Sequence, residues 1–124
     1  MIAIDTSSLV SYFSGKNGPD IDAVEQAFRS GTAILPPMVV SEILSDPQLP
    51  LAIEQKILKI PLLEIESDFW QRVGILRRNL LKRKLKARLA DALIAQVCLD
   101  HHTPLITRDA DFKKFEKYSG LKLV

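Results

Sequence analysis

The chain has few of the features that mark secreted or membrane proteins. Its single cysteine, Cys98, excludes an internal disulfide and fits a reducing compartment. No apolar run approaches the roughly 20 residues of a membrane helix, and the opening residues MIAID lack the basic start and apolar core of a signal peptide. We therefore expect a cytoplasmic protein without membrane contact. Its 124 residues suffice for a single domain, residues 1–124, with its own core.

Signatures of nucleotide-binding loops are also absent. No G-x-G-x-x-G sequence follows the first predicted strand, which excludes a dinucleotide-binding domain, and a P-loop is excluded for the same reason. Phosphoryl transfer through an aspartyl nucleophile usually pairs two acids closely after the first strand, whereas Asp5 is followed by Thr6, Ser7 and Ser8. The sequence therefore disfavours these three classes of protein.

One part of the chain lacks acidic residues. No Asp or Glu lies between Asp68 and Asp91, and the segment RRNLLKRKLKAR within that gap has seven basic residues in twelve positions. This basic strip has two open interpretations. It is either a solvated helix face with a basic end, which the helix dipole favours, or a surface that binds phosphates. Its candidate RNA-binding residues are Arg77, Arg78, Lys82, Arg83, Lys84, Lys86 and Arg88.

Segments typical of strands and of helices alternate along the chain. Short aliphatic runs predict strands, and apolar residues at helical spacing predict helices. We expect Thr6 and Ser7 to cap the first helix. The alternation predicts an α/β fold in which a parallel sheet carries helices on both faces. The predicted strands are 1–5, 32–35, 62–64, 104–107 and 121–124, and the predicted helices are 8–14, 20–30, 38–45, 51–59, 67–86, 87–101 and 109–118.

Four acids stand out because each belongs to an otherwise apolar segment. Asp5 and Asp109 follow predicted strands, and Glu42 and Asp91 lie in predicted apolar helices. Ligands of open α/β sheets gather beyond the carboxyl ends of the strands, so we expect these acids to converge there. Four carboxylates in one place cannot all ionise without a counter-charge. An oxygen-only cluster is the ligand set of Mg²⁺ or Mn²⁺.

Each acid also has a structural explanation. Asp109 suits a helix N-cap, and Asp111 and Asp91 suit the first turn of a helix, where the dipole favours negative charge. Glu42 has the option of pairing with an arginine. Taken singly, the structural explanation is simpler for each acid, and it is the joint pattern that favours a metal site.

Three stretches of the sequence resemble one known family. MIAIDTSSLVSYF, VVSEIL and LADALIAQVCLDHHTPLITRDADF resemble the PIN-domain ribonucleases, specifically the VapC-type toxins of prokaryotic toxin–antitoxin pairs. The resemblance runs over essentially the whole chain. It implies that the four catalytic, metal-binding acids of the family are Asp5, Glu42, Asp91 and Asp109. It further implies outer positions around the metal for Asp111, Ser7 and Thr107.

The resemblance carries expectations about fold and function. It implies a PIN-like fold, with about five parallel strands flanked by helices, and Mg²⁺- or Mn²⁺-dependent hydrolysis of RNA that leaves 5′-phosphate and 3′-hydroxyl ends. It also implies a homodimer, a VapB-like antitoxin that covers the acidic site, and binding of operator DNA only through that antitoxin. An acidic pocket does not hold RNA by itself, so we expect the basic strip to bind the RNA backbone. The alternative is a non-catalytic PIN-like module that binds its antitoxin and contributes to operator repression.

Overall fold

Three short parallel strands form the centre of the computed structural model, which describes residues 1–124. Strand β1 (Ile2–Ile4) lies between β2 (Ala33–Ile34) and β3 (Leu105–Ile106), so that the order is β2-β1-β3. Ala3 is in register with Ile34 on one side and with Leu105 on the other. Both faces of such a sheet are covered by helices, which explains why the strand residues are almost entirely aliphatic.

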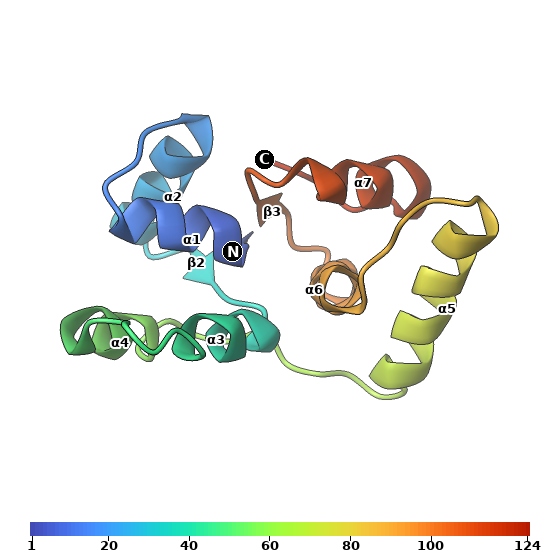
Figure 1. Ribbon diagram of the computed structural model, residues 1–124, viewed down its shortest axis with the longest axis horizontal. Helices are drawn as coiled ribbons and strands as arrows, with labels where there is room; N and C mark the ends of the chain where they lie inside the picture. Colours follow the sequence, from blue (N-terminus) through green and yellow to red (C-terminus); the bar gives the residue numbers. More distant parts are fainter.

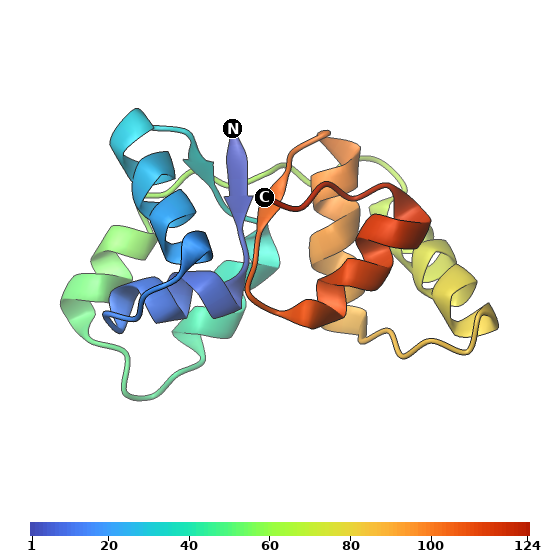
Figure 2. The same ribbon diagram turned by 90° about the horizontal axis from the view of Figure 1, so that it is seen from above.

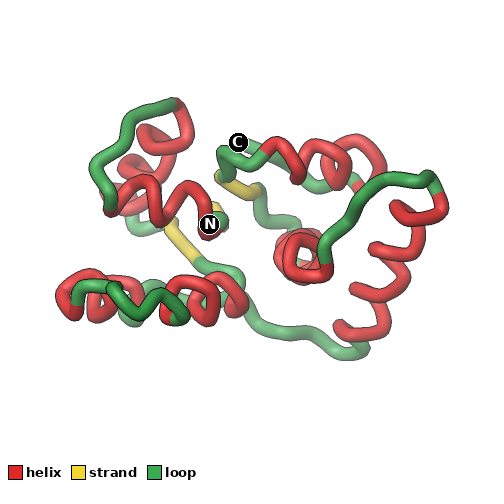
Figure 3. The backbone as a smooth tube through the Cα atoms, in the orientation of Figure 1, coloured by secondary structure: helices red, strands yellow, loops and turns green.

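The predicted parallel α/β fold is confirmed, but the sheet has fewer full strands than the predicted five. The outer two members are single parallel bridges, one between Leu35 and Leu62 and one between Leu105 and Leu123. Figure 3 shows how little of the backbone is strand compared with helix. Pro61 precedes one bridge, and proline has no N–H to extend a ladder.

Helices surround the sheet on both sides. Figures 1 and 2 show α1 and α2 on one side of the strands and α5, α6 and α7 on the other. None of the helices combines the length and the apolar character that spanning a membrane requires. Their bounds are α1 Thr6–Phe13, α2 Pro19–Ser30, α3 Pro37–Leu44, α4 Leu51–Ile57, α5 Phe69–Lys82, α6 Leu89–Asp100 and α7 Lys113–Ser119, with a 3₁₀ turn, η1, at Ala110–Phe112.

The first helix begins two residues earlier than predicted. Asp5 is the N-cap of α1 and makes no side-chain capping bond, and Thr6 is already helical. The predicted capping by Thr6 and Ser7 is therefore wrong. Both hydroxyls instead donate to carboxylates, Thr6 to Glu42 and Ser7 to Asp5. Hydrogen bonds to charged carboxylates are stronger than capping bonds to the backbone, so the two hydroxyls donate to the carboxylates.

Helix α5 ends earlier than predicted, at Lys82 rather than at Lys86. Lys84 has a left-handed backbone with φ +61°. The N–H of Lys84 donates to the carbonyl of Leu81 and that of Leu85 to the carbonyl of Leu80. This pair of bonds is the Schellman ending of a helix, formed here without glycine. The second half of the basic strip is consequently a loop that leads to α6, not a helix face.

Phe112 anchors the η1 turn in the core, and Phe112→Ala is expected to lower the free energy of unfolding by about 3–5 kcal/mol. The Phe112 side chain is 1% exposed and its ring centroid lies 5.9 Å from that of Phe115. Urea unfolding measures the effect, with Phe112→Leu as the control that retains most of the packing. A loss below about 1 kcal/mol in the alanine variant would contradict this anchoring role.

Candidate metal centre

The carboxyl ends of the strands face the starts of several helices at one edge of the molecule. Figure 2 shows β1 pointing toward this edge, where α1, α6 and η1 begin. Asp5 follows β1, Thr107 follows β3, and Asp91 lies in the first turn of α6. The parallel register of β1 and β3 therefore brings residues from distant parts of the chain to one place.

Asp5 is the most deeply buried acid of this edge, with 4% of its surface exposed. Its Oδ2 accepts hydrogen bonds from Ser7 Oγ and Thr107 Oγ1, each at 2.8 Å. Burial raises the pKa of Asp5, while the two hydroxyls and nearby backbone N–H groups partly offset that effect. The hydroxyls of Ser7 and Thr107 thus fix the orientation of the Asp5 carboxylate.

Thr107 connects Asp5 to Asp109. The Thr107 hydroxyl donates to Asp5 and accepts the backbone N–H of Asp109 at 3.0 Å. The Oδ1 of Asp109 in turn accepts the N–H of Asp111 at 2.9 Å, so Asp109 caps the η1 turn. The capping bond uses one carboxylate oxygen, and the second oxygen remains available to a ligand.

Asp91 contains the least satisfied polar atom of the edge. Its Oδ2 is buried and has no hydrogen-bond partner. Burial, followed by repulsion from Asp109 and Asp5, raises the pKa of Asp91 to about 6, and the positive charge of Arg88 partly offsets this. A buried carboxylate oxygen without a partner is costly unless a cation or a proton satisfies it.

Asp111 lies close to Asp91 and Asp109. Asp91, Asp109 and Asp111 each offer a carboxylate oxygen, and these oxygens lie within 4.8 Å of one another. Arg88 Nη2 lies 3.6 Å from Asp111 Oδ2. The resemblance implied an outer position around the metal for Asp111, and the first turn of a helix was the structural alternative. We call Asp91, Asp109 and Asp111 the acidic cluster.

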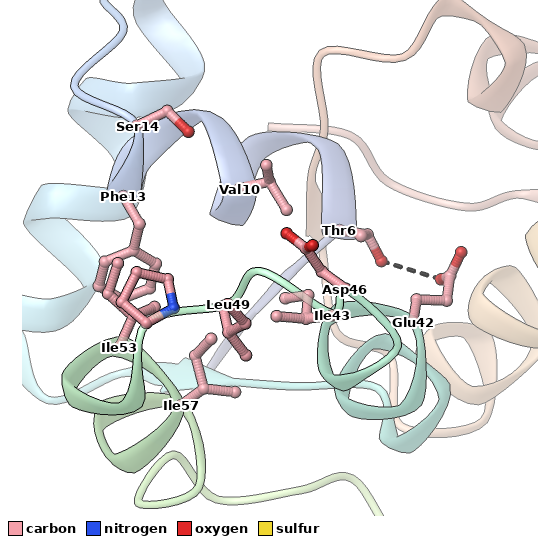
Figure 4. Close-up of a pocket in the computed structure, with 11 residues that line it drawn as sticks. Thr6, Val10, Phe13, Ser14, Glu42, Ile43, Asp46, Leu49, Ile53 and Ile57 are labelled. Carbon is pink, nitrogen blue, oxygen red and sulfur yellow. Dashed lines mark hydrogen bonds between the residues drawn. The ribbon is translucent and has the colours of Figure 1, made fainter.

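Glu42 lies beside the edge but is not part of the acidic cluster. It is exposed on α3, and its Oε1 accepts a 2.9 Å hydrogen bond from Thr6 Oγ1 rather than pairing with an arginine. Figure 4 shows this bond at one end of a cavity of about 280 Å³ between α1, α3 and α4. Most of the cavity is apolar, with Ile43, Ile53 and Ile57 among its lining residues. Only its Glu42 end adjoins the acids.

The acids of this edge fit a hard divalent cation. The donors are all carboxylate oxygens, which Mg²⁺ and Mn²⁺ prefer, and the partnerless oxygen of Asp91 is the observation that indicates a missing positive charge. The residues suited to hold such an ion are Asp91, Asp109 and Asp111, with Asp5 adjacent through Thr107. The positive charge of Arg88 is only a weak substitute for that of a metal ion, because its guanidinium contacts the exposed side of Asp111.

An ion pair that sequence analysis did not identify holds one segment of the site in place. Arg108 donates to Asp20 through Nε at 2.8 Å and through Nη2 at 3.0 Å. Asp20 also accepts a 2.8 Å hydrogen bond from the buried Ser8 hydroxyl. The hydrogen bonds from Arg108, and to a smaller extent that from Ser8, lower the pKa of Asp20. The bidentate pair holds the segment between Thr107 and Asp109 against α1 and α2. The residues lie too far apart in sequence for any local signal to reveal it.

The basic strip is divided between structural and exposed residues. Arg77 Nε donates to the carbonyl of Ala87 at 2.7 Å, and the guanidinium of Arg83 lies 4.3 Å from the centre of the Tyr118 ring. Arg88 contacts the acidic cluster, as described above. The remaining strip residues, Arg78, Lys82, Lys84 and Lys86, are exposed. The strip therefore runs from α5 along the loop to the site, with Arg77 serving the fold.

Comparisons with known proteins agree with this arrangement. A sequence model of the PIN domain matches residues 2–118. Similar solved structures include VapBC2 from Rickettsia felis bound to a DNA fragment from its promoter, with 20% identity, a TM-score of 0.74 and coverage of 100% of this chain and 98% of that chain. VapBC-5 from Mycobacterium tuberculosis, a member of the VapBC family of toxin-antitoxin systems, has 16% identity, a TM-score of 0.71 and coverage of 99% and 96%.

A third similar structure is FitAcB from Neisseria gonorrhoeae, with 16% identity, a TM-score of 0.69 and coverage of 99% of this chain and 96% of that chain. No curated protein matches the sequence. At these identities the solved structures establish the shared fold over the full chain.

Asp91→Asn is expected to stabilise the metal-free protein above pH 6, by roughly 1 kcal/mol after solvent screening of this half-exposed group. The pKa of Asp91 is about 6 in the folded protein, against the ordinary value of 3.8 for an aspartate. Ionisation of Asp91 therefore destabilises the folded protein progressively as the pH rises between these two values. The full loss of stability is reached above pH 6. Below both values the cost disappears, so the variant and the parent should be equally stable there.

Urea unfolding in EDTA at pH 7.5 and at pH 3.5 measures this difference. Asp22→Asn, a change of an exposed acid on α2, is the control. Addition of Mn²⁺ should raise the Tm of the parent at pH 7.5 and leave that of Asp91→Asn nearly unchanged. A variant that is less stable than the parent in EDTA at pH 7.5 would show that Asp91 is already satisfied without a cation.

Proposed function

The chain belongs to the PIN domain family, and we propose that it is a Mg²⁺- or Mn²⁺-dependent endoribonuclease, the toxin of a type II toxin–antitoxin pair. The single observation that carries the proposal is the partnerless buried oxygen of Asp91, which lies against Asp109 and Asp111. A PIN domain that served only as a binding module would gain stability by losing such a costly group. The retained cost favours a metal-dependent role.

Each acid has a proposed part in catalysis. Asp91, Asp109 and Asp111 hold the cation, and Asp5 is oriented toward the same edge by Ser7 and Thr107. Glu42, held by Thr6, borders the site as the remaining catalytic acid of the family pattern. When bound, the divalent ion supplies the positive charge that lowers the pKa of an attacking water and neutralises the phosphate.

The proposed reaction is hydrolysis of an RNA phosphodiester bond. A water oxygen forms a bond to phosphorus, and the bond between phosphorus and the 3′-oxygen breaks. The attacking water loses a proton and the leaving 3′-oxygen gains one, which yields 5′-phosphate and 3′-hydroxyl ends. The carboxylates at this edge that do not hold the cation, Asp5 and Glu42, are the bases nearest to the attacking water.

The proposed partners follow from the structural neighbours. Those neighbours come from toxin–antitoxin systems, and one is bound to promoter DNA. We propose that this chain forms a homodimer in the cytoplasm, that a VapB-like antitoxin inhibits it by covering the acidic edge, and that operator DNA is contacted through the antitoxin. A non-catalytic module that only binds its antitoxin is the alternative, and an assay of RNA cleavage separates the two.

Cleavage of single-stranded RNA is expected with Mg²⁺ or Mn²⁺ and not in EDTA. Asp91→Asn and Asp5→Asn should each lower the cleavage rate at least about 100-fold, because a preorganised electrostatic group of this kind contributes about 10²–10³ to the rate. Asp22→Asn is the matched control. Sequencing of the product ends measures the position of the cut. Full activity of the Asp91→Asn variant would show that Asp91 is not a metal ligand.

The exposed lysines of the loop are expected to bind the RNA backbone. The double variant Lys84→Gln, Lys86→Gln should flatten the slope of log K against log salt by about 1.4, because each phosphate contact to a single strand contributes about 0.7. Binding is measured in EDTA, which prevents cleavage, by anisotropy of a labelled RNA. The control is Lys56→Gln, Lys59→Gln on and just after α4, in the other half of the molecule. An unchanged slope would contradict this role.

A further inference from the structure

A second groove lies between α5 and α7, away from the apolar cavity beside Glu42. Its volume is about 450 Å³, which is within the range of small-ligand sites. Figure 1 shows the C-terminal end of α5 next to α7, at the opposite end of the molecule from α4. The groove is lined by Leu76, Asn79, Leu80, Lys82, Arg83, Tyr118 and Ser119.

The chemistry of this lining is that of a nucleotide site. Tyr118 is 39% exposed, and the guanidinium of Arg83 lies 4.3 Å from the centre of its ring. Lys117 Nζ lies 5.2 Å from the same centre. Arg and Tyr together offer planar groups on which a base stacks. Lys82 and Arg83 supply charge for a phosphate, and no acid lines the groove.

We propose that the groove between α5 and α7 binds one nucleotide of a single-stranded RNA, by base stacking at Tyr118 and Arg83 and by a phosphate contact at Lys82. This inference rests on the proposed function, because it assigns the α5–α7 groove to the same RNA that is cut at the acidic edge. The groove adds a contact to the RNA away from the phosphodiester that is cut. The basic strip alone does not imply that an aromatic ring, Tyr118, takes part in this contact.

The position of the groove limits which RNA fits. Arg83 in the groove and Arg88 at the acidic cluster are five residues apart in the chain, a span of at most about 18 Å. Stacked nucleotides advance about 3.4 Å each, so roughly five nucleotides bridge this distance. The bound RNA therefore needs an unpaired segment of no more than about five nucleotides between the cut and the groove, as loops and single strands provide.

An acidic peptide is the competing ligand for a basic groove, and the structure favours RNA over it. A peptide carboxylate needs only the charges of Lys82 and Arg83, whereas the stacked ring of Tyr118 adds nothing to its recognition. The groove is also continuous in sequence with the exposed lysines that lead to the acidic edge. A strand of phosphates follows such a path, with one charge per nucleotide.

The experiment measures binding in EDTA, by anisotropy, of a mixed-sequence single-stranded RNA of 20 nucleotides. Tyr118→Ala should weaken binding of this RNA about five- to a hundredfold, as loss of one stacked base does. Tyr118→Phe should bind the RNA as the parent does. The controls are Trp70→Ala, an exposed aromatic on the same α5, and Arg29→Ala, an exposed charge on α2.

Each outcome decides the proposal. If Tyr118→Ala and the parent bind the RNA equally, the proposal is overturned. Thermal unfolding is used to check that both proteins are folded. Loss of binding that is equal in Tyr118→Ala and Tyr118→Phe would also overturn it, because phenylalanine keeps the ring on which a base stacks. Labelled polyglutamate that loses affinity in Lys82→Gln but not in Tyr118→Ala, together with unchanged RNA binding in Tyr118→Ala, would assign the groove to an acidic peptide instead.

The proposed nuclease activity is judged separately. Absence of cleavage in Mg²⁺ and Mn²⁺, together with weakened RNA binding in Tyr118→Ala, would leave the α5–α7 groove as an RNA site and refute the nuclease. Normal cleavage together with unchanged binding in Tyr118→Ala would refute the groove and leave the nuclease.

Discussion

Mutual repulsion among carboxylates at the carboxyl ends of the strands is the constraint on which the rest of the structure depends. Burial raises the pKa of both Asp5 and Asp91, and the charges of Asp109 and Asp5 add to the effect on Asp91. Asp5 is compensated by two hydroxyls, whereas the buried oxygen of Asp91 is compensated by none. The fold thus accepts an electrostatic cost at one place, and the proposed cation would offset that cost.

The elements around this edge hold the acids in place rather than neutralising them. The register of β1 and β3 sets Asp5 beside Thr107, and the Thr107 hydroxyl then fixes both Asp5 and the backbone of Asp109. The bidentate pair of Arg108 and Asp20 fastens the same segment to the opposite helices. Strands of two or three residues are sufficient for this task because each one only needs to direct a single side chain to the edge.

The sequence predicted the layout well and the contacts less well. Alternating patterns predicted the parallel α/β fold, and the helix predicted at 20–30 agrees with α2 (Pro19–Ser30) to within one residue. The end of α5 was missed because a left-handed lysine, Lys84, occupies the position where glycine is expected. The hydroxyls of Thr6 and Ser7 were assigned to capping because their true acceptors come from packing that no local pattern encodes. The proximity of Asp111 to Asp91 and Asp109 also depends on packing, and the use of these acids as metal ligands stays a prediction.

The reduction of both outer strands to single bridges has a consequence for self-association. Edge strands present unpaired backbone groups that recruit further strands, and very short edges are a common protection against such pairing. Here the bridges at Leu62 and Leu123 leave no edge long enough to serve as a template for amyloid-like growth. The sheet can therefore stay small and open at both sides without the charged or bulged edges that longer sheets need to remain unaggregated.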